Sequence, residues 1–234
     1  MSRLFRCLAG VLFLVSLVAA RCGTSGSNAG VVTPQADGLL ETALNHFREA
    51  ESFRFSIRIA HDWVFEEGQY RWNYLGEGAF RAPDSYRFTT VGSADSGGTV
   101  EIEGGTVSAW DARGEVARPT TTWGAPGYGA SPYSVIAYLR GLEQANSLGE
   151  DTIDGQAMER YSFSPQRNEV AAIDGAHAAI ADKINRVEGE LWVDASDKWP
   201  ARVSVTVRYV SVSGNEETVQ TTLDFTGYGE PVDL

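Results

Sequence analysis

The chain has 234 residues, of which 43% are hydrophobic and 21% charged, so it can build one domain with a core, and wholesale disorder is excluded. Asp and Glu number 31 against 19 Lys and Arg, and the formal net charge of −12 argues against nucleic-acid binding, because neutralising phosphates requires clustered cations. The two cysteines, Cys7 and Cys22, leave no disulfide framework in the body of the chain, and three dispersed histidines predict neither a metal site nor a cofactor.

The first 21 residues have the pattern of an export signal. Arg3 and Arg6 form a short basic region, and an uncharged apolar run follows from Cys7 to Ala20. This run is shorter than the roughly 20 residues that a membrane-spanning helix needs. We therefore expect residues 1–21 to direct export.

Two processing sites are compatible with this signal. Val18 and Ala20 place small residues where signal peptidase requires them, which predicts a soluble secreted protein. Alternatively, Leu17–Cys22 resembles a bacterial lipobox, in which Cys22 becomes the diacylated first residue, although Arg21 stands where that pattern has a small residue. A lone cysteine at this place has no evident packing role, which favours lipidation.

A linker and one folded domain are expected after the signal. Residues 22–33 are rich in Gly, Ser and Thr, as is typical of a flexible tether, and residues 34–234 contain no repeat and no convincing domain boundary. The predicted location is the outer face of the cell membrane or the periplasm, with anchoring through an acylated Cys22. A soluble secreted protein is the alternative. We expect a monomer without a nucleic-acid partner.

The domain begins with a helix and an alternating strand. Residues 34–52 predict the helix, because their apolar side chains form one stripe. Apolar and mostly polar residues then alternate, which predicts a half-buried strand. The apolar members are Phe53, Phe55, Ile57 and Ile59.

Aromatic residues share one face of the next strand. They are Tyr70, Trp72, Tyr74 and Phe80, and Tyr86 and Phe88 follow in the strand after it. Gly76 and Gly78 lie inside the aromatic face. Interior glycines of a strand mark a bend or a close approach, so we expect these two to curve the sheet.

A hairpin and two helical insertions follow. Val100–Ala109 has two glycines at its centre, which predicts a hairpin with Ile102 opposite Val107. Ser131 suits an N-cap before a short helix, whose apolar stripe includes Ile136 and Leu139. Apolar residues at near-helical spacing predict a second insertion over residues 169–184.

Three alternating strands close the chain, at residues 187–194, 201–212 and 217–227. The total is about nine or ten antiparallel strands with few helices, an α+β arrangement. So few helices cannot cover a flat sheet of this size, so a strongly curved sheet wrapped around its helices fits better. The aromatic strands and the valine strand 203–209 offer more apolar face than two short helices fill, which predicts a cavity for an apolar ligand.

Catalytic motifs are absent from the sequence. It contains no Gly-x-Ser-x-Gly, no phosphate-binding glycine loop and no His-Glu-x-x-His. His46, His61 and His177 fall in separate elements, and Glu216-Glu217 is placed at a turn as solvated charge. We expect a protein that is not an enzyme. A hydrolase or sugar-binding protein is a minor alternative.

Several turn and strand segments resemble the LolA-like superfamily of bacterial lipoprotein carriers, and more closely the LppX/LprG-type lipoproteins. The segments are Gly76–Asp84, Ile153–Gly155 with Arg160–Phe163, Gly189–Asp194 with Trp199–Arg202, and Asp224–Val232. The resemblance covers residues 36–234. It implies an unclosed half β-barrel with an N-terminal helix and two helical insertions over the concave face.

The implied function is a cell-envelope lipoprotein that binds a lipid, glycolipid or lipoprotein acyl chain in an apolar cavity, for shielding or transfer. The expected ligand-binding residues are Phe55, Ile57, Ile59, Trp72, Tyr74, Phe80, Phe88, Ile136 and Leu139. Residues 123–131 and 169–184 are candidate lids. The alternative is a non-carrier module for envelope interaction or stress regulation, with a packed core and a functional surface.

Overall fold

The structure is a computed structural model that describes residues 34–65, 68–92, 97–104, 106–111, 113–117, 130–165, 183–211 and 214–234. The chain separates into two units, residues 1–31 and 32–234, and all described residues belong to the second. The predicted signal and tether lie outside the described residues, and so do residues 123–129 and 169–182 of the two candidate lids. No helix of the described part is long and apolar enough to cross a membrane.

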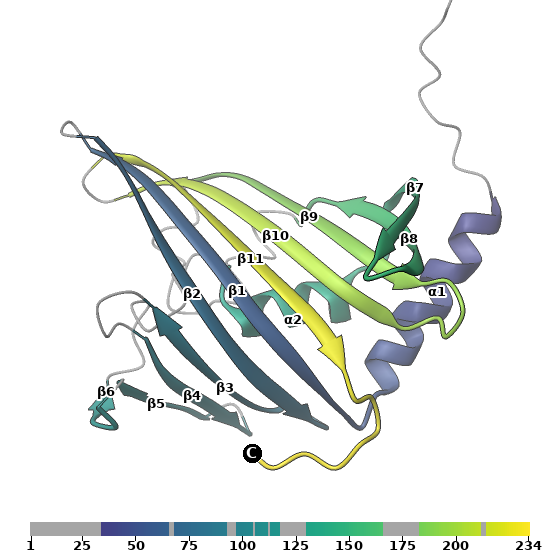
Figure 1. Ribbon diagram of the computed structural model, residues 1–234, viewed down its shortest axis with the longest axis horizontal. Coiled ribbons are helices and arrows are strands. Elements are labelled where there is room, and N and C mark those ends of the chain that lie inside the picture. The colour runs from purple at the N-terminus through teal and green to yellow at the C-terminus, as the bar shows by residue number, and fades with distance from the viewer. Residues whose placement is uncertain are drawn as a thin grey trace, which may run out of the picture. The chain divides into compact units, whose positions relative to one another are not determined.

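Two helices and eleven strands make up the described part of the domain (Figure 1). In chain order they are α1 (Pro34–Glu49), β1 (Ser52–Phe65), β2 (Gly68–Arg81), β3 (Ser85–Gly92), β4 (Gly97–Glu103), β5 (Thr106–Asp111), β6 (Val116–Ala117), α2 (Pro132–Gly141), β7 (Asn146–Ile153), β8 (Gln156–Phe163), β9 (Ile184–Asp194), β10 (Pro200–Val210) and β11 (Glu216–Thr226). The strand beyond the predicted nine or ten is β6, whose two residues are too few to show a period.

All eleven strands form one antiparallel sheet, in the order β6-β5-β4-β3-β2-β1-β11-β10-β9-β8-β7. The chain therefore builds one arm outward from β1 with β2 to β6, and the other arm inward from β7 to β11. The edge strands β6 and β7 do not pair with each other, so the curved sheet stays open. This confirms the predicted α+β class with an unclosed half β-barrel.

The inner face of the sheet follows the alternation that the sequence predicts. Phe55 of β1 pairs with Gly78 of β2 and Phe225 of β11, and all the odd-numbered apolar residues of β1 up to Ile59 are buried. On β10, Val203, Val205 and Val207 are fully buried on the same face. An inner face this apolar must be covered, and it is covered by helices.

Both helices lie on this inner face (Figure 1). Phe47 of α1 packs its ring on Phe53 and Phe225, with centroids 5.0 and 5.2 Å apart. α2 packs against α1, β10 and β11, and buries Ile136 and Leu139 completely. Its N-cap is Ser131, as predicted, whose Oγ accepts the Ser134 backbone N–H at 3.1 Å.

Two boundaries differ from the predicted ones. α1 ends at Glu49, before Ser52, because Ser52 already pairs with Arg81 as the first residue of β1. Ile184, expected at the end of the second insertion, instead opens β9 opposite Tyr209 and is buried there. Strand pairing with distant residues determines where α1 ends and where β9 begins. The helical periodicity of the sequence gives no information about such pairing.

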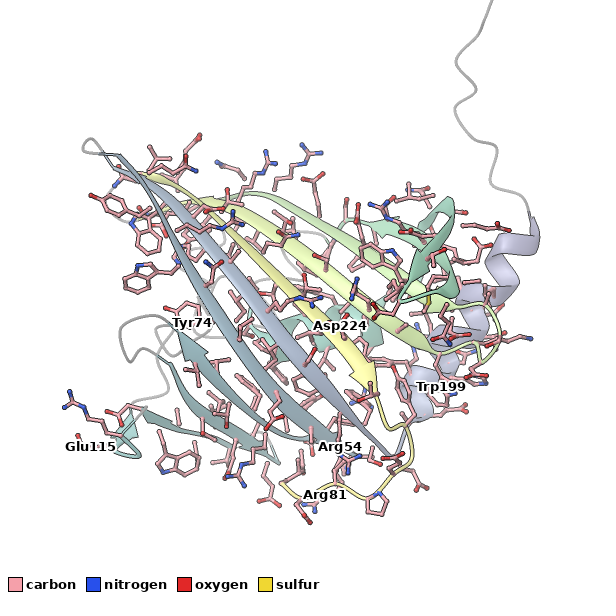
Figure 2. The ribbon with its side chains drawn as sticks, viewed as in Figure 1. Arg54, Tyr74, Arg81, Glu115, Trp199 and Asp224 are labelled. Atoms are coloured by element: carbon pink, nitrogen blue, oxygen red, sulfur yellow. The ribbon has the colours of Figure 1, made fainter. Side chains whose placement is uncertain are left out.

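The outer face carries charged side chains. Arg58 of β1 and Arg202 of β10 both contact the carboxylate of Asp224, which lies on β11 between them (Figure 2). Arg54 of β1 reaches Glu230 of the C-terminal tail at 2.6 Å. The Arg54–Glu230 pair is exposed, and pairs of that kind contribute little stability each.

Candidate functional site

Eight of the nine predicted ligand-binding residues meet in one core. Phe55, Ile57, Ile59, Tyr74, Phe80, Phe88, Ile136 and Leu139 are each at most 6% exposed and belong to the same hydrophobic cluster. Six come from β1, β2 and β3, and two descend onto them from α2. The prediction therefore identified side chains that share one face, and in the structure these side chains are packed against one another.

The ring of Phe55 lies over its cross-strand partner Gly78. A Cβ at position 78 would fall 2.4 Å from that ring and 2.7 Å from the Cβ of Phe88, so only glycine fits. Gly189 of β9 accommodates Phe163 of β8 in the same way, at 2.2 Å. The predicted close approach at Gly78 is thus confirmed.

The ninth predicted residue, Trp72, lies apart from the core. It is 44% exposed, and its ring stands almost perpendicular to Trp63, with centroids 4.8 Å apart. Tyr70 is also 44% exposed and stacks on the other side, 6.4 Å from Trp63. We name Trp63, Tyr70 and Trp72 the mouth aromatics. They lie on the inner face of β1 and β2, beyond Tyr74, at the end where these two strands are joined.

A polar network adjoins the mouth aromatics. His61 donates from Nε2 to the Glu217 carboxylate at 2.7 Å, and the Tyr209 hydroxyl donates to the same oxygen at 2.5 Å. Burial raises the pKa of the Glu217 carboxyl, but the hydrogen bonds from His61 and Tyr209 outweigh it and hold that pKa below its ordinary value. The Glu217 side chain faces inward from β11, directly opposite Trp63, so its predicted placement at a turn as solvated charge is wrong.

The opposite end of the core is closed by Arg140 of α2. Its guanidinium lies over the Phe80 ring, 4.9 Å from the centroid. Nη1 donates to the Pro83 carbonyl at 3.2 Å and to the Tyr86 hydroxyl at 3.4 Å. Burial raises the pKa of the Tyr86 phenol, so its hydroxyl stays protonated at neutral pH.

The described residues line hollows of different sizes. One of about 670 Å³ runs between α1, the segment 142–146 and the end of β8, and one of about 520 Å³ lies on the outer face of the sheet around Gly78, among Arg54, Ser56 and Glu77. Another, of about 250 Å³, is the Arg140 pocket, lined by Asp84, Tyr86, Ile102, Tyr133, Ala137 and Arg140. Of the predicted ligand-binding residues, Phe55 and Phe88 line one of these hollows.

Sequence reasoning missed Trp63 and Arg140. Trp63 continues the odd-numbered alternation of β1 two residues beyond His61, a signal that could have extended the aromatic row. Arg140 gave no such signal, because its acceptor at Pro83 lies 57 residues away.

Comparisons with solved structures find matches of low sequence identity. Over 86% of this chain, lipoprotein LppX of Mycobacterium tuberculosis matches along 98% of its own length, with a TM-score of 0.49 and 13% identity. LprF of Mycobacterium bovis matches at a TM-score of 0.41 and 12% identity, over 87% of this chain and 97% of LprF. A LolA superfamily protein of Nitrosomonas europaea matches at 0.38 and 13%, over 88% and 96% of the two chains.

No protein-family model matches the sequence, and no curated protein does either. At these identities and TM-scores the likeness assigns no ligand and no partner. LppX and a LolA superfamily protein, which are of the kinds that the turn and strand segments resemble, are among the matched structures.

Proposed function

We propose that this protein is a cell-envelope lipoprotein that binds the acyl chain of a lipid, glycolipid or lipoprotein on the inner face of the half-barrel, for shielding or transfer. One observation carries the proposal: the exposed mouth aromatics adjoin the buried core through Tyr74, which belongs to the core and lies 6.4 Å from Trp72. Clustered aromatic side chains left open to solvent on a folded domain mark an interaction site for apolar material.

Acyl-chain burial supplies enough free energy for such a role. Each buried CH₂ contributes about 0.8 kcal/mol, so ten methylenes contribute about 8 kcal/mol before the costs of association. The eight core residues are packed against one another in the structure. An acyl chain can therefore enter only if α2 moves away from the strands beneath it. Binding is therefore coupled to a movement of the helical cover over the inner face.

We propose binding rather than catalysis. The most reactive arrangement among the described residues is the network of His61, Tyr209 and Glu217, and there both donors are directed to the one carboxylate. That supports a structural role for the network. Extracted ligand should keep its mass after prolonged incubation with the protein, and accumulation of a cleavage product would contradict this part of the proposal.

The location follows from the signal and tether. An acylated Cys22 ahead of residues 23–33 would hold the domain at the membrane surface, within reach of the lipids that it is proposed to bind. A soluble exported form would bind the same ligands through the same face.

The experiment is native mass spectrometry of the full chain, with organic extraction of whatever co-purifies. Trp72→Glu places a charge at the mouth and should abolish the bound lipid. Leu75→Glu is the matched control, because Leu75 is 62% exposed on the opposite face of β2. Phe80 is unsuitable for the test, because a charge at that fully buried position would unfold the domain.

A second candidate function is the interaction module with a packed core. The burial of all eight core residues favours it. An apo mass that is unchanged after incubation with lipid extracts would establish this alternative over the carrier.

A further inference from the structure

We propose that the Arg140 pocket binds a carboxylate, and that it holds the head of a fatty acid whose chain enters the core beside Phe80. The inference rests on the proposed function, and it adds the ligand's charge and the place of its head. The pocket measures about 250 Å³ and opens between α2 and the strands β3 and β4. That volume suits a carboxylate with a few carbon atoms.

Two donors converge on the pocket. Arg140 and Tyr86 both line it, and Nη1 of Arg140 lies 3.4 Å from the Tyr86 hydroxyl. Tyr86 accepts from Arg140, and among the described residues its own proton has no acceptor. A carboxylate oxygen within reach of both would accept the Tyr86 O–H and would replace the Tyr86 hydroxyl as acceptor of the Nη1 N–H, and both bonds are charge-assisted.

The positive charge of Arg140 lacks an acidic partner. Eight ion pairs are found among the described residues, and none includes Arg140. Its other contacts are the backbone carbonyls of Pro83 and Arg48 and the face of Phe80. In a chain of net charge −12, a partly buried guanidinium without a carboxylate is a place for a ligand's charge.

A carboxylate fits better than a phosphate. The pocket offers one cation, and Asp84 on its wall opposes a second negative charge. The remaining lining, from Ile102, Tyr133 and Ala137, is mostly apolar and suits the carbon atoms next to a carboxylate.

The pocket adjoins the core at Phe80. The guanidinium of Arg140 lies on one ring face, and Tyr86 lies 4.9 Å from the same ring. Phe80 in turn stacks on Phe53 at 4.7 Å, inside the cluster that holds the predicted ligand-binding residues. The acyl chain of a fatty acid whose carboxylate lies at Arg140 would therefore enter the inner face of the sheet beside Phe80, at the end opposite the mouth aromatics.

The test is titration calorimetry of the full chain, freed of lipid, with oleate, oleyl alcohol and acetate. We expect oleate to bind at least about tenfold more tightly than oleyl alcohol, the loss associated with one hydrogen bond to a charged group. Equal affinity for the two would overturn the carboxylate site and leave the proposed function standing. If neither amphiphile binds, the proposed function itself fails.

Variants locate the site. Tyr86→Phe removes one donor and leaves the backbone contacts of Arg140, so it should weaken oleate binding about tenfold without affecting oleyl alcohol. Arg140→Gln should remove the preference for oleate, and Arg140→Lys should restore part of it. Arg208→Gln, on the exposed outer face of β10, removes the same charge elsewhere and should change nothing.

Thermal unfolding of each variant separates loss of the site from loss of the fold. Retention of the full oleate preference in folded Arg140→Gln and Tyr86→Phe would overturn the assignment. Acetate that binds as tightly as oleate would support a carboxylate pocket for free small acids and overturn its connection to the acyl chain.

Discussion

Arg48 and Arg140 each donate a hydrogen bond to the backbone carbonyl of the other. Nε of Arg48 lies 2.9 Å from the Arg140 carbonyl, and Nη2 of Arg140 lies 3.5 Å from the Arg48 carbonyl. Arg48 also donates to the Leu142 carbonyl at 2.5 Å, just beyond α2. Each cation thereby satisfies carbonyls at the C-terminal end of the other helix, where the helix dipole favours positive charge. The contact joins α1 to α2, the helix that must move if the inner face is to open.

Arg48→Gln should therefore loosen α2. The loss of charge-assisted hydrogen bonds predicts a decrease of about 1–3 kcal/mol in the free energy of unfolding. Amide exchange should speed up in α2 more than in the central strands. Equal protection of α2 in the variant and the parent protein would show that the two helices do not depend on this contact. Thr42→Ala, on an exposed side chain of the same helix, is the control.

Gly78→Ala should destabilise the sheet by about 1–3 kcal/mol, because the new Cβ would overlap the Phe55 ring. Chemical denaturation measures the loss. The smaller side chain in the double variant with Phe55→Leu should recover part of it, and strict additivity would contradict the contact. Gly141→Ala is the matched control, since a Cβ there meets nothing within 4 Å and its backbone conformation is ordinary.

Particular residues show how far the sequence could predict this fold. The alternation in β1 correctly predicted which side chains lie on the inner face, and the glycines of β2 predicted a close approach there. Both features depend on local chain geometry. Trp72 shares that alternation with Tyr74, yet only Tyr74 is buried. Periodicity assigns a face of a strand but does not show where the helical cover over that face ends.

The site could be predicted only in part for the same reason. The apolar lining shows in the pattern of single strands, whereas the polar groups act across long separations. Glu217 contacts His61 across 156 residues, and Arg140 contacts Tyr86 across 54. A local sequence pattern cannot identify a partner at that separation. These polar contacts could therefore be found only from the folded structure.

The carboxylate of Asp194 should make the free energy of unfolding decrease at acidic pH. Burial raises the pKa of its carboxyl, but hydrogen bonds from Ser196 and from the backbone N–H of Asp197 outweigh it and lower that pKa overall. A depressed folded-state pKa stabilises the protein above the unfolded-state value of about 3.8, and this contribution is lost as pH falls through the folded-state value. Asp194→Asn should cost about 1–3 kcal/mol at neutral pH.

The measurement is denaturation of both proteins from pH 7 to pH 2. The difference in unfolding free energy between the parent protein and Asp194→Asn should shrink as pH falls below about 4. A constant difference over that range would assign the loss to packing rather than to the charge. Asp154→Asn, on the exposed turn between β7 and β8, is the control.

Cys22→Ser should release the protein from membranes. If Cys22 carries the acyl groups, its removal leaves residues 23–33 without an anchor, and the domain should move to the soluble fraction. Cys7→Ser is the matched control, because Cys7 lies inside the predicted export signal. Arg21→Ala restores the small residue of the lipobox and should increase labelling by radioactive palmitate. A parent protein that takes up no label and remains soluble would establish the secreted form, and the inner face would then bind its ligand without a tether.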